Sequence, residues 1–214
     1  QVAMAETTTP SGLPRVDAAS RDRLLKDVLK GVSRSFYLTL RVLPKNLREP
    51  IGLAYLLART ADTLTDRHRR AGFTGARLEG LVVLRSQLVG PADASVLRKL
   101  AAQSMDGDPS PEDRALFGSL VECFALLESF DIADREQVRW VVDKLTQGME
   151  MDLTSFPAED SGELVALATG AHLDRYTYLV AGCVGEFWTR ITVAHASTLK
   201  WWDVAQMSET GVRF

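Results

Sequence analysis

Between Tyr55 and Asp66 the chain reads YLLARTADTLTD, an apolar run of helical period that carries a tyrosine, an arginine and two aspartates. Arg59, Asp62 and Asp66 stand at positions i, i+3 and i+7, and Tyr55 precedes Arg59 by one turn. At about 100° per residue, these four fall within about 60° of the helix circumference. The other positions are mostly leucine and alanine, as in a buried helix. Buried charge is unfavourable unless it is paired or holds a metal, so the stripe is expected to line a polar pocket.

Two carboxylates one turn apart suit a magnesium ion. Mg²⁺ takes one or two protein carboxylates and completes its octahedron with water and phosphate oxygens. We therefore predict Asp62 and Asp66 as metal ligands and expect diphosphate chemistry. The alternative is a solvated helix face, on which Asp and Arg form i, i+3 or i+4 ion pairs. The apolar surroundings favour the pocket.

The preceding segment, VSRSFYLTLRVLP from Val32 to Pro44, opens with an arginine between two serines and continues as an apolar helix. Alone, SRSF is a weak pattern, because short Ser/Arg clusters are common at helix starts. Together, SRSF, LP and RxxDxxxD resemble the first half of the squalene/phytoene synthase family. Members of that family join two isoprenyl diphosphates head to head.

A third segment, DRYTYLVAGCVGEFW, resembles the family's helix pattern D-x-Y-x-Y-x-V-A-G-x-V-G. Its glycines, Gly182 and Gly185, each disfavour a helix by roughly 1 kcal/mol relative to alanine. We therefore predict that they allow close contact with another helix. Tyr176 is assigned to the pocket, where it would steer a carbocation with its π face or transfer a proton.

Helical spacing also places residues near Tyr176. Val180, Cys183 and Val184, at offsets of four, seven and eight, are predicted to form an apolar wall beside it. QGMEMDL, which ends at Leu153, resembles bacterial members of the family. Its Asp152 fits a polar lining and a surface charge equally well.

The resemblance implies a role for each matching residue. Tyr176, Arg59, Asp62 and Asp66 are the expected catalytic residues, with Asp62 and Asp66 also holding Mg²⁺. The expected substrate-binding residues are Val32, Ser33, Arg34, Ser35, Phe36, Tyr55, Arg59, Val180, Cys183 and Val184. Of these, Ser33, Arg34 and Ser35 would bind the second diphosphate. Val32 is a departure, because several carotenoid-forming members carry histidine there.

The predicted fold is all-α, a class I isoprenoid synthase bundle that stops before the family's second Asp-rich helix. We expect residues 1–14 to be disordered and residues 15–214 to form a partial synthase domain. The chain is therefore expected to be a fragment, or to receive the missing helices from a second chain. Helices are predicted over residues 18–42, 46–70, 75–88, 91–105, 111–130, 134–155, 161–171, 172–195 and 198–210. Ser110 and Pro111 are typical of a helix start.

Composition excludes some partners and compartments. Apolar residues are 46% of the chain, and its net charge of −3 gives no basic footprint for nucleic acid. Cys123 and Cys183 are too far apart for a metal or redox motif and suggest buried thiols in a reducing cytosol. The beginning, QVAMAETTTPSG, lacks the features of a signal peptide, and no apolar stretch is long enough to cross a bilayer. The predicted location is cytoplasmic, with peripheral membrane contact for product release as an option.

The favoured function is that of a bacterial-type squalene synthase. Two farnesyl diphosphates would give presqualene diphosphate, which NADPH would reduce to squalene. A phytoene or dehydrosqualene synthase, which needs no reductant, is the enzymatic alternative, and a noncatalytic helical scaffold is the alternative from another class. The 214-residue chain alone is expected to be inactive, because its metal site would have carboxylates on one wall only.

Overall fold

The computed structural model of the protein describes residues 12–33, 35–66, 74–106, 108–158 and 161–214. Over these residues the chain is helical and contains no strand, which confirms the all-α prediction. The α-helices are α1 (Ala18–Asp22), α2 (Leu29–Ser33), α3 (Phe36–Val42), α4 (Lys45–Asp66), α5 (Thr74–Val89), α6 (Ala94–Ser104), α7 (Pro111–Gly118), α8 (Leu120–Ser129), α9 (Ile132–Ser155), α10 (Gly170–Thr177), α11 (Cys183–His195) and α12 (Val204–Arg213). π-Helical turns cover Arg23–Val28 (η1) and Tyr178–Gly182 (η3), and a 3₁₀ turn covers Ser197–Leu199 (η4).

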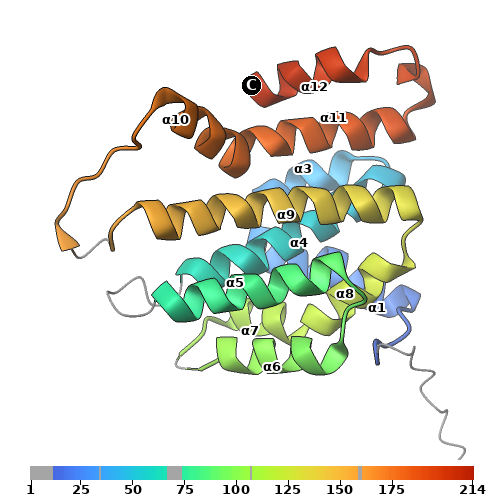
Figure 1. Ribbon diagram of the computed structural model, residues 1–214. Helices are drawn as coiled ribbons and strands as arrows, with labels where there is room; N and C mark the ends of the chain where they lie inside the picture. The colour runs from blue at the N-terminus through green and yellow to red at the C-terminus, as the bar shows by residue number, and fades with distance from the viewer. Residues whose placement is uncertain (1–11, 34, 67–73, 107, 159–160) are drawn as a thin grey trace, which may run out of the picture.

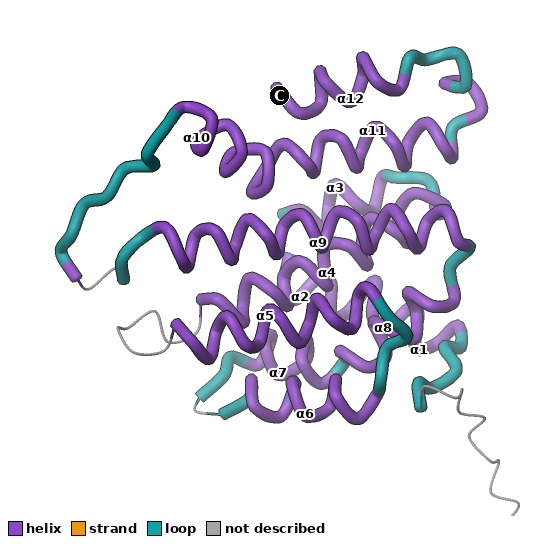
Figure 2. Tube along the Cα trace, viewed as in Figure 1, coloured by secondary structure: helices purple, strands orange, loops and turns teal. Residues whose placement is uncertain are grey.

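Helix α9 crosses the middle of the bundle (Figures 1 and 2). It packs against α4 and α5 on one side and against α11 on the other, and α12 lies on the outer side of α11. The core is built largely from leucine, with Phe117 and Phe124 among its largest fully buried side chains. Helix α4 is buried over most of its length because leucine and alanine occupy most of its circumference. The motif helix is therefore central to the fold.

Local capping explains several of the boundaries. The Ser110 hydroxyl accepts a hydrogen bond from the Asp113 amide at 3.1 Å, and Pro111 occupies the first helical position, as predicted. At Ser119 the backbone leaves the helical region, so the predicted helix 111–130 is divided into α7 and α8. The Ser119 hydroxyl donates to the Ala115 carbonyl and accepts from Arg23, which stabilises this break.

The predicted helix over 161–171 is wrong, since the backbone after Ser161 has no regular structure until α10 begins at Gly170. Gly162 adopts a positive φ of 70°, and Leu164 and Val165 are exposed. These apolar side chains therefore have little buried surface to gain from a helix. The start of α10 is fixed instead by the Thr169 hydroxyl, which accepts a hydrogen bond from the His172 amide.

Helices α11 and α12 approach each other through glycine, which confirms the predicted small-residue contact. A β-carbon on Gly185 would overlap the carbonyl group of Gly211, and one on Gly211 would lie 2.7 Å from the Gly185 oxygen. A β-carbon on Gly182 would lie 3.1 Å from Val212 Cγ1. The two glycines in the middle of this contact let the backbones meet at a distance that no side chain would allow.

Two further predictions concern the beginning of the chain and the end of the motif helix. Leu13 is buried in the core, so the packed part of the chain includes a residue within the predicted disordered segment. Residues 67–70, the predicted end of the motif helix, lie outside the described residues. Cys123 and Cys183 are free thiols buried in the core. Where the chain is described, no helix combines the length and apolar character needed to cross a bilayer.

Candidate active site

The polar stripe of α4 runs from a half-buried phenol to an exposed carboxylate. Tyr55, Arg59 and Asp62 are half-buried, and Asp66 is exposed at the last position of the helix. The Arg59 guanidinium forms an ion pair with Asp62, one turn along the helix. Because the side chains of this pair keep about a third or more of their surface exposed, it lies at the edge of the bundle rather than in a dry core.

Tyr55 joins the motif helix to the segment that precedes it. Its hydroxyl donates a hydrogen bond to the Val32 carbonyl at 3.3 Å, and its ring stacks on Phe36 with centroids 4.9 Å apart. Burial raises the pKa of Tyr55 above its usual value, and the charge of Asp62 also raises it, against the opposing effect of Arg59. The structure therefore brings Val32 and Phe36 to one end of the predicted site.

The three residues assigned to the second diphosphate are placed differently. Ser33 is buried, and its hydroxyl donates to the Leu29 carbonyl in its own helix. Ser35 is exposed just before α3, and its side chain makes no capping hydrogen bond to that helix. Arg34 lies outside the described residues. The Ser33 hydroxyl is therefore occupied by a hydrogen bond within its own helix, and the Ser35 hydroxyl is the one accessible to a ligand.

A cavity of about 270 Å³ separates the ends of α4 and α9. Asp66 lines it from α4, Asp152 from α9 and Arg77 from α5. Leu153 and Phe156 add an apolar side. Of the two predicted metal ligands, Asp66 lines this cavity, and Asp62, one turn earlier on α4, pairs with Arg59.

Asp152 faces Tyr176 as well as the cavity. The Tyr176 hydroxyl donates to Asp152 Oδ1 at 2.8 Å, and the Tyr176 ring meets Phe156 edge to face with centroids 5.6 Å apart. Burial, followed by the hydrogen bond and charge of Asp152, raises the pKa of Tyr176 to about 12. Tyr176 is therefore a protonated hydrogen-bond donor near neutral pH. Asp152, which the sequence left open between two environments, lines the cavity.

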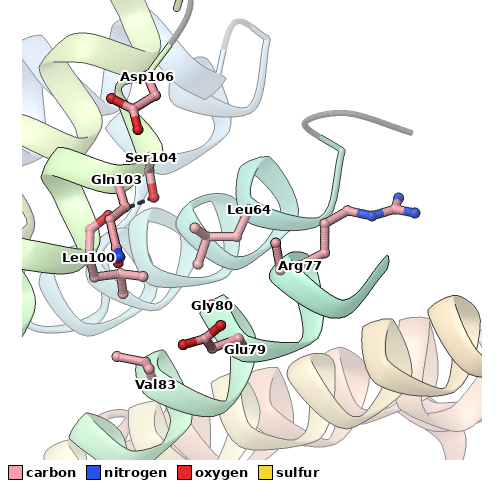
Figure 3. Close-up of a pocket in the computed structure, with 10 residues that line it drawn as sticks. Leu64, Arg77, Glu79, Gly80, Val83, Leu100, Gln103, Ser104 and Asp106 are labelled. Atoms are coloured by element: carbon pink, nitrogen blue, oxygen red, sulfur yellow. Dashed lines mark hydrogen bonds between the residues drawn. The ribbon is translucent and has the colours of Figure 1, made fainter. Parts of the chain in front are cut away.

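Arg77 is a member of this site that the sequence does not single out. Its guanidinium donates to the Thr65 carbonyl at 3.0 Å, next to Asp66, and its Nε is buried without a hydrogen-bond partner. Figure 3 shows a second cavity, of about 290 Å³, from which the Arg77 guanidinium points away. Arginine on an amphipathic helix normally predicts solvent exposure, so its burial here depends on the tertiary arrangement of α4 and α5.

The predicted apolar wall is only partly assembled. Cys183 is fully buried in the core, and its thiol contacts the Leu179 carbonyl at 3.3 Å. Burial raises its pKa to about 11. Val180 is 38% exposed and faces Gly148 of α9, while Val184 packs against the core. The π-helical turn η3 lies between Tyr176 and Cys183 and changes the spacing on which the prediction depended.

The residues of the cavity fit a magnesium ion in their chemistry. Asp66 and Asp152 supply carboxylate oxygens from two helices, and Mg²⁺ needs only one or two protein carboxylates when phosphate oxygens complete its coordination. The described residues contain no cluster of three or more His, Cys, Asp or Glu side chains that could enclose a metal alone. The arrangement therefore suits a metal shared with a phosphorylated substrate better than a closed protein site.

Comparison with known proteins gives one consistent result. The family model described as squalene/phytoene synthase matches residues 29–211. A squalene synthase from Yarrowia lipolytica (strain CLIB 122 / E 150) is 26% identical over 167 residues, which are 78% of this chain and 34% of that protein. Two solved complexes of TcSQS, one with the ligand E5700 and one with BPH1237, superpose with TM-scores of 0.64 and 0.63 at 22% identity. They cover 90% and 89% of this chain, which spans about half of each.

Proposed function

Because the chain belongs to the squalene/phytoene synthase family, we propose that it forms part of an enzyme that condenses two prenyl diphosphates head to head. The proposed substrates are two farnesyl diphosphates, and the proposed products are presqualene diphosphate and, after reduction by NADPH, squalene. Similarity to a protein named squalene synthase supports this choice of product over phytoene or dehydrosqualene. The observation that carries the proposal is the cavity that Asp66 and Asp152 line together. The Tyr176 hydroxyl donates a hydrogen bond to Asp152 beside this cavity.

Ionisation of an allylic diphosphate requires that the leaving negative charge be stabilised. Asp66 and Asp152 would hold Mg²⁺, which when bound supplies positive charge to the phosphate oxygens. Arg77 lines the same cavity, and its guanidinium would add positive charge beside a bound anion. Arg59 is paired with Asp62 and so holds that carboxylate in place. Asp62 remains a proposed Mg²⁺ ligand, but it could bind the metal only after its ion pair with Arg59 breaks.

The tyrosine is suited to a role as a neutral donor. A pKa of about 12 keeps Tyr176 protonated near neutral pH, and its hydrogen bond fixes the phenol beside Asp152. Its oxygen can still accept a hydrogen bond, and its ring can face a developing carbocation. Leu153 and Phe156 line the same cavity and would help to exclude water from that ion.

The proposal includes a requirement for further helices. The chain spans about a third of its relative from Yarrowia lipolytica and about half of the two superposed structures. We propose that helices equivalent to the rest of those proteins, on the same or a second polypeptide, complete the metal site and the NADPH site. Without them, the chain is expected to bind prenyl diphosphate weakly and to release no diphosphate. A noncatalytic scaffold is the alternative.

Substitution of the carboxylates in the complete enzyme tests the proposal. Asp66→Asn and Asp152→Asn should each lower Mg²⁺-dependent diphosphate release by about 100-fold or more, because each removes a charged ligand without changing side-chain volume. Asp27→Asn is the matched control, since Asp27 is exposed on η1. Normal release at saturating Mg²⁺ by both cavity variants would overturn the metal assignment. Equal loss in all three variants would point to a general effect of charge.

A further inference from the structure

A third cavity, of about 470 Å³, lies among α1, η1, α3 and the start of α4 and is strongly basic. Its cationic lining consists of Arg21, Lys26, Arg41, Lys45 and Arg48, and its acidic lining consists of Asp22 and Glu49. The chain as a whole is slightly acidic, with a net charge of −3. The cavity lining therefore carries an excess of positive charge, five cations against two carboxylates, although the chain as a whole is acidic.

Ion pairs inside the cavity leave part of this charge without a partner. Lys26 pairs with Asp22 at 2.7 Å, and Glu49 pairs with Arg21 and more distantly, at 3.7 Å, with Lys45. Both carboxylates are therefore already engaged. Within the described part of the chain, the Arg41 guanidinium takes part in no ion pair. Of the five cations, Arg41 and Arg48 are the two without a carboxylate partner among the described residues, so they remain available to an anion that enters the cavity.

Arg48 gives the cavity a fixed cationic wall. Its Nη2 donates to the Arg41 carbonyl at 2.9 Å and to the Leu43 carbonyl at 2.6 Å. These carbonyls lie at the end of α3, so Arg48 also stabilises the negative end of that helix. A guanidinium anchored in this way loses little conformational entropy when an anion binds beside it.

Two large aliphatic side chains stand exposed on the same short helix. Leu38 is 63% exposed and Val42 is 82% exposed, and they lie one turn apart on α3. Arg41 precedes Val42, and Lys45 follows within one further turn of chain. A solvent-facing pair of aliphatic residues beside a cluster of cations has the amphipathic character of a segment that lies on a membrane surface.

We infer that this face of the molecule, α3 with the basic cavity beside it, docks onto a bilayer that contains anionic phospholipid. The headgroup phosphate enters the cavity, and Leu38 and Val42 contact the acyl boundary. A nucleic acid would satisfy the cations but would leave the two aliphatic side chains without an apolar partner, so the lipid surface fits both halves of the face. This inference does not depend on the proposed catalytic activity.

The test is flotation of the full chain with vesicles of phosphatidylcholine, alone or mixed with phosphatidylglycerol. Binding is expected only when phosphatidylglycerol is present, and it should weaken as salt is added. Arg41→Gln with Lys45→Gln should lower the affinity on the order of 20-fold, because each cation near a membrane surface contributes roughly fivefold. Arg98→Gln with Lys99→Gln is the matched control, since both residues are exposed on α6.

A second pair of variants separates lipid from a simple anion. Leu38→Ser with Val42→Ser keeps the charge and should lower vesicle binding on the order of tenfold. Val82→Ser with Val89→Ser, exposed on α5, should leave it unchanged. All four substituted aliphatic side chains are exposed, and circular dichroism checks that each variant is folded. Equal loss of binding in the two charge variants would overturn the inference. No vesicle binding, or full binding by the Leu38/Val42 variant, would overturn it too.

Discussion

Tyr176 and Tyr178 offer a comparison that separates catalysis from stability. Each phenol donates to a carboxylate, Tyr176 to Asp152 at 2.8 Å and Tyr178 to Glu186 at 2.7 Å. Each is partly buried and has a pKa of about 12, for the same causes: burial first, then the carboxylate partner. Asp152 lines the cavity with Asp66, whereas Glu186 pairs with an arginine on its own helix.

Replacement by phenylalanine removes one hydrogen bond to a charged acceptor in either case. Such a bond contributes about 1.5–3 kcal/mol, and partial exposure reduces this to about 1 kcal/mol. Tyr176→Phe and Tyr178→Phe should therefore destabilise the protein to a similar, small extent. If the Tyr176 hydroxyl acts in the transition state, Tyr176→Phe should also lower kcat by about 100-fold or more, equivalent to about 2.7 kcal/mol, while KM stays nearly constant.

The assay is steady-state diphosphate release by the complete enzyme, together with urea unfolding followed by circular dichroism on the same preparations. A normal kcat for Tyr176→Phe, accompanied by a lower midpoint of unfolding, would show that the hydroxyl stabilises the fold and does not act in catalysis. Equal loss of kcat in the two variants would also refute the reasoning, because it would show that the cavity does not distinguish the two phenols.

Three further predictions concern packing and titration. Gly185→Ala should destabilise the protein by about 1–3 kcal/mol, because the new methyl group overlaps the backbone of Gly211. Gly80→Ala makes only ordinary van der Waals contacts and should stabilise the protein by up to about 1 kcal/mol. Urea unfolding measures both changes. Burial raises the pKa values of Cys123 and Cys183 to about 12 and about 11, so a thiol reagent at neutral pH should label neither until the protein unfolds. The raised pKa of Tyr176 means that its contribution to stability is complete below pH 10 and is lost as the pH rises through about 12; unfolding at a series of alkaline pH values should show a weaker decline for Tyr176→Phe.

Local patterns were sufficient to predict much of the helical framework. The period of α4 and the proline before it place that helix almost at its observed start, and Ser110 with Pro111 marks the start of α7. The contact through Gly185 also followed from the low helix propensity of glycine. Each of these depends on the neighbouring sequence alone, and this is why the sequence was informative.

The site itself depends on contacts between distant residues. Asp152 and Tyr176 are 24 residues apart, and Arg77 reaches the cavity from a third helix. No local pattern shows that these groups meet. The π-helical turn before Cys183 likewise changes a spacing that a regular helix would have kept, and Leu164 is exposed because none of the described elements covers it. Pairing and burial of this kind are tertiary properties.

The central claim is tested most directly by product analysis of the complete enzyme that contains these 214 residues. It would be incubated with Mg²⁺ and either farnesyl or geranylgeranyl diphosphate, with and without NADPH, and the products identified by mass spectrometry. The proposal predicts presqualene diphosphate from farnesyl diphosphate without NADPH and squalene with it. Phytoene from geranylgeranyl diphosphate, or dehydrosqualene without any reductant, would contradict the assignment as a squalene synthase. Absence of every head-to-head product would contradict the proposed catalytic function.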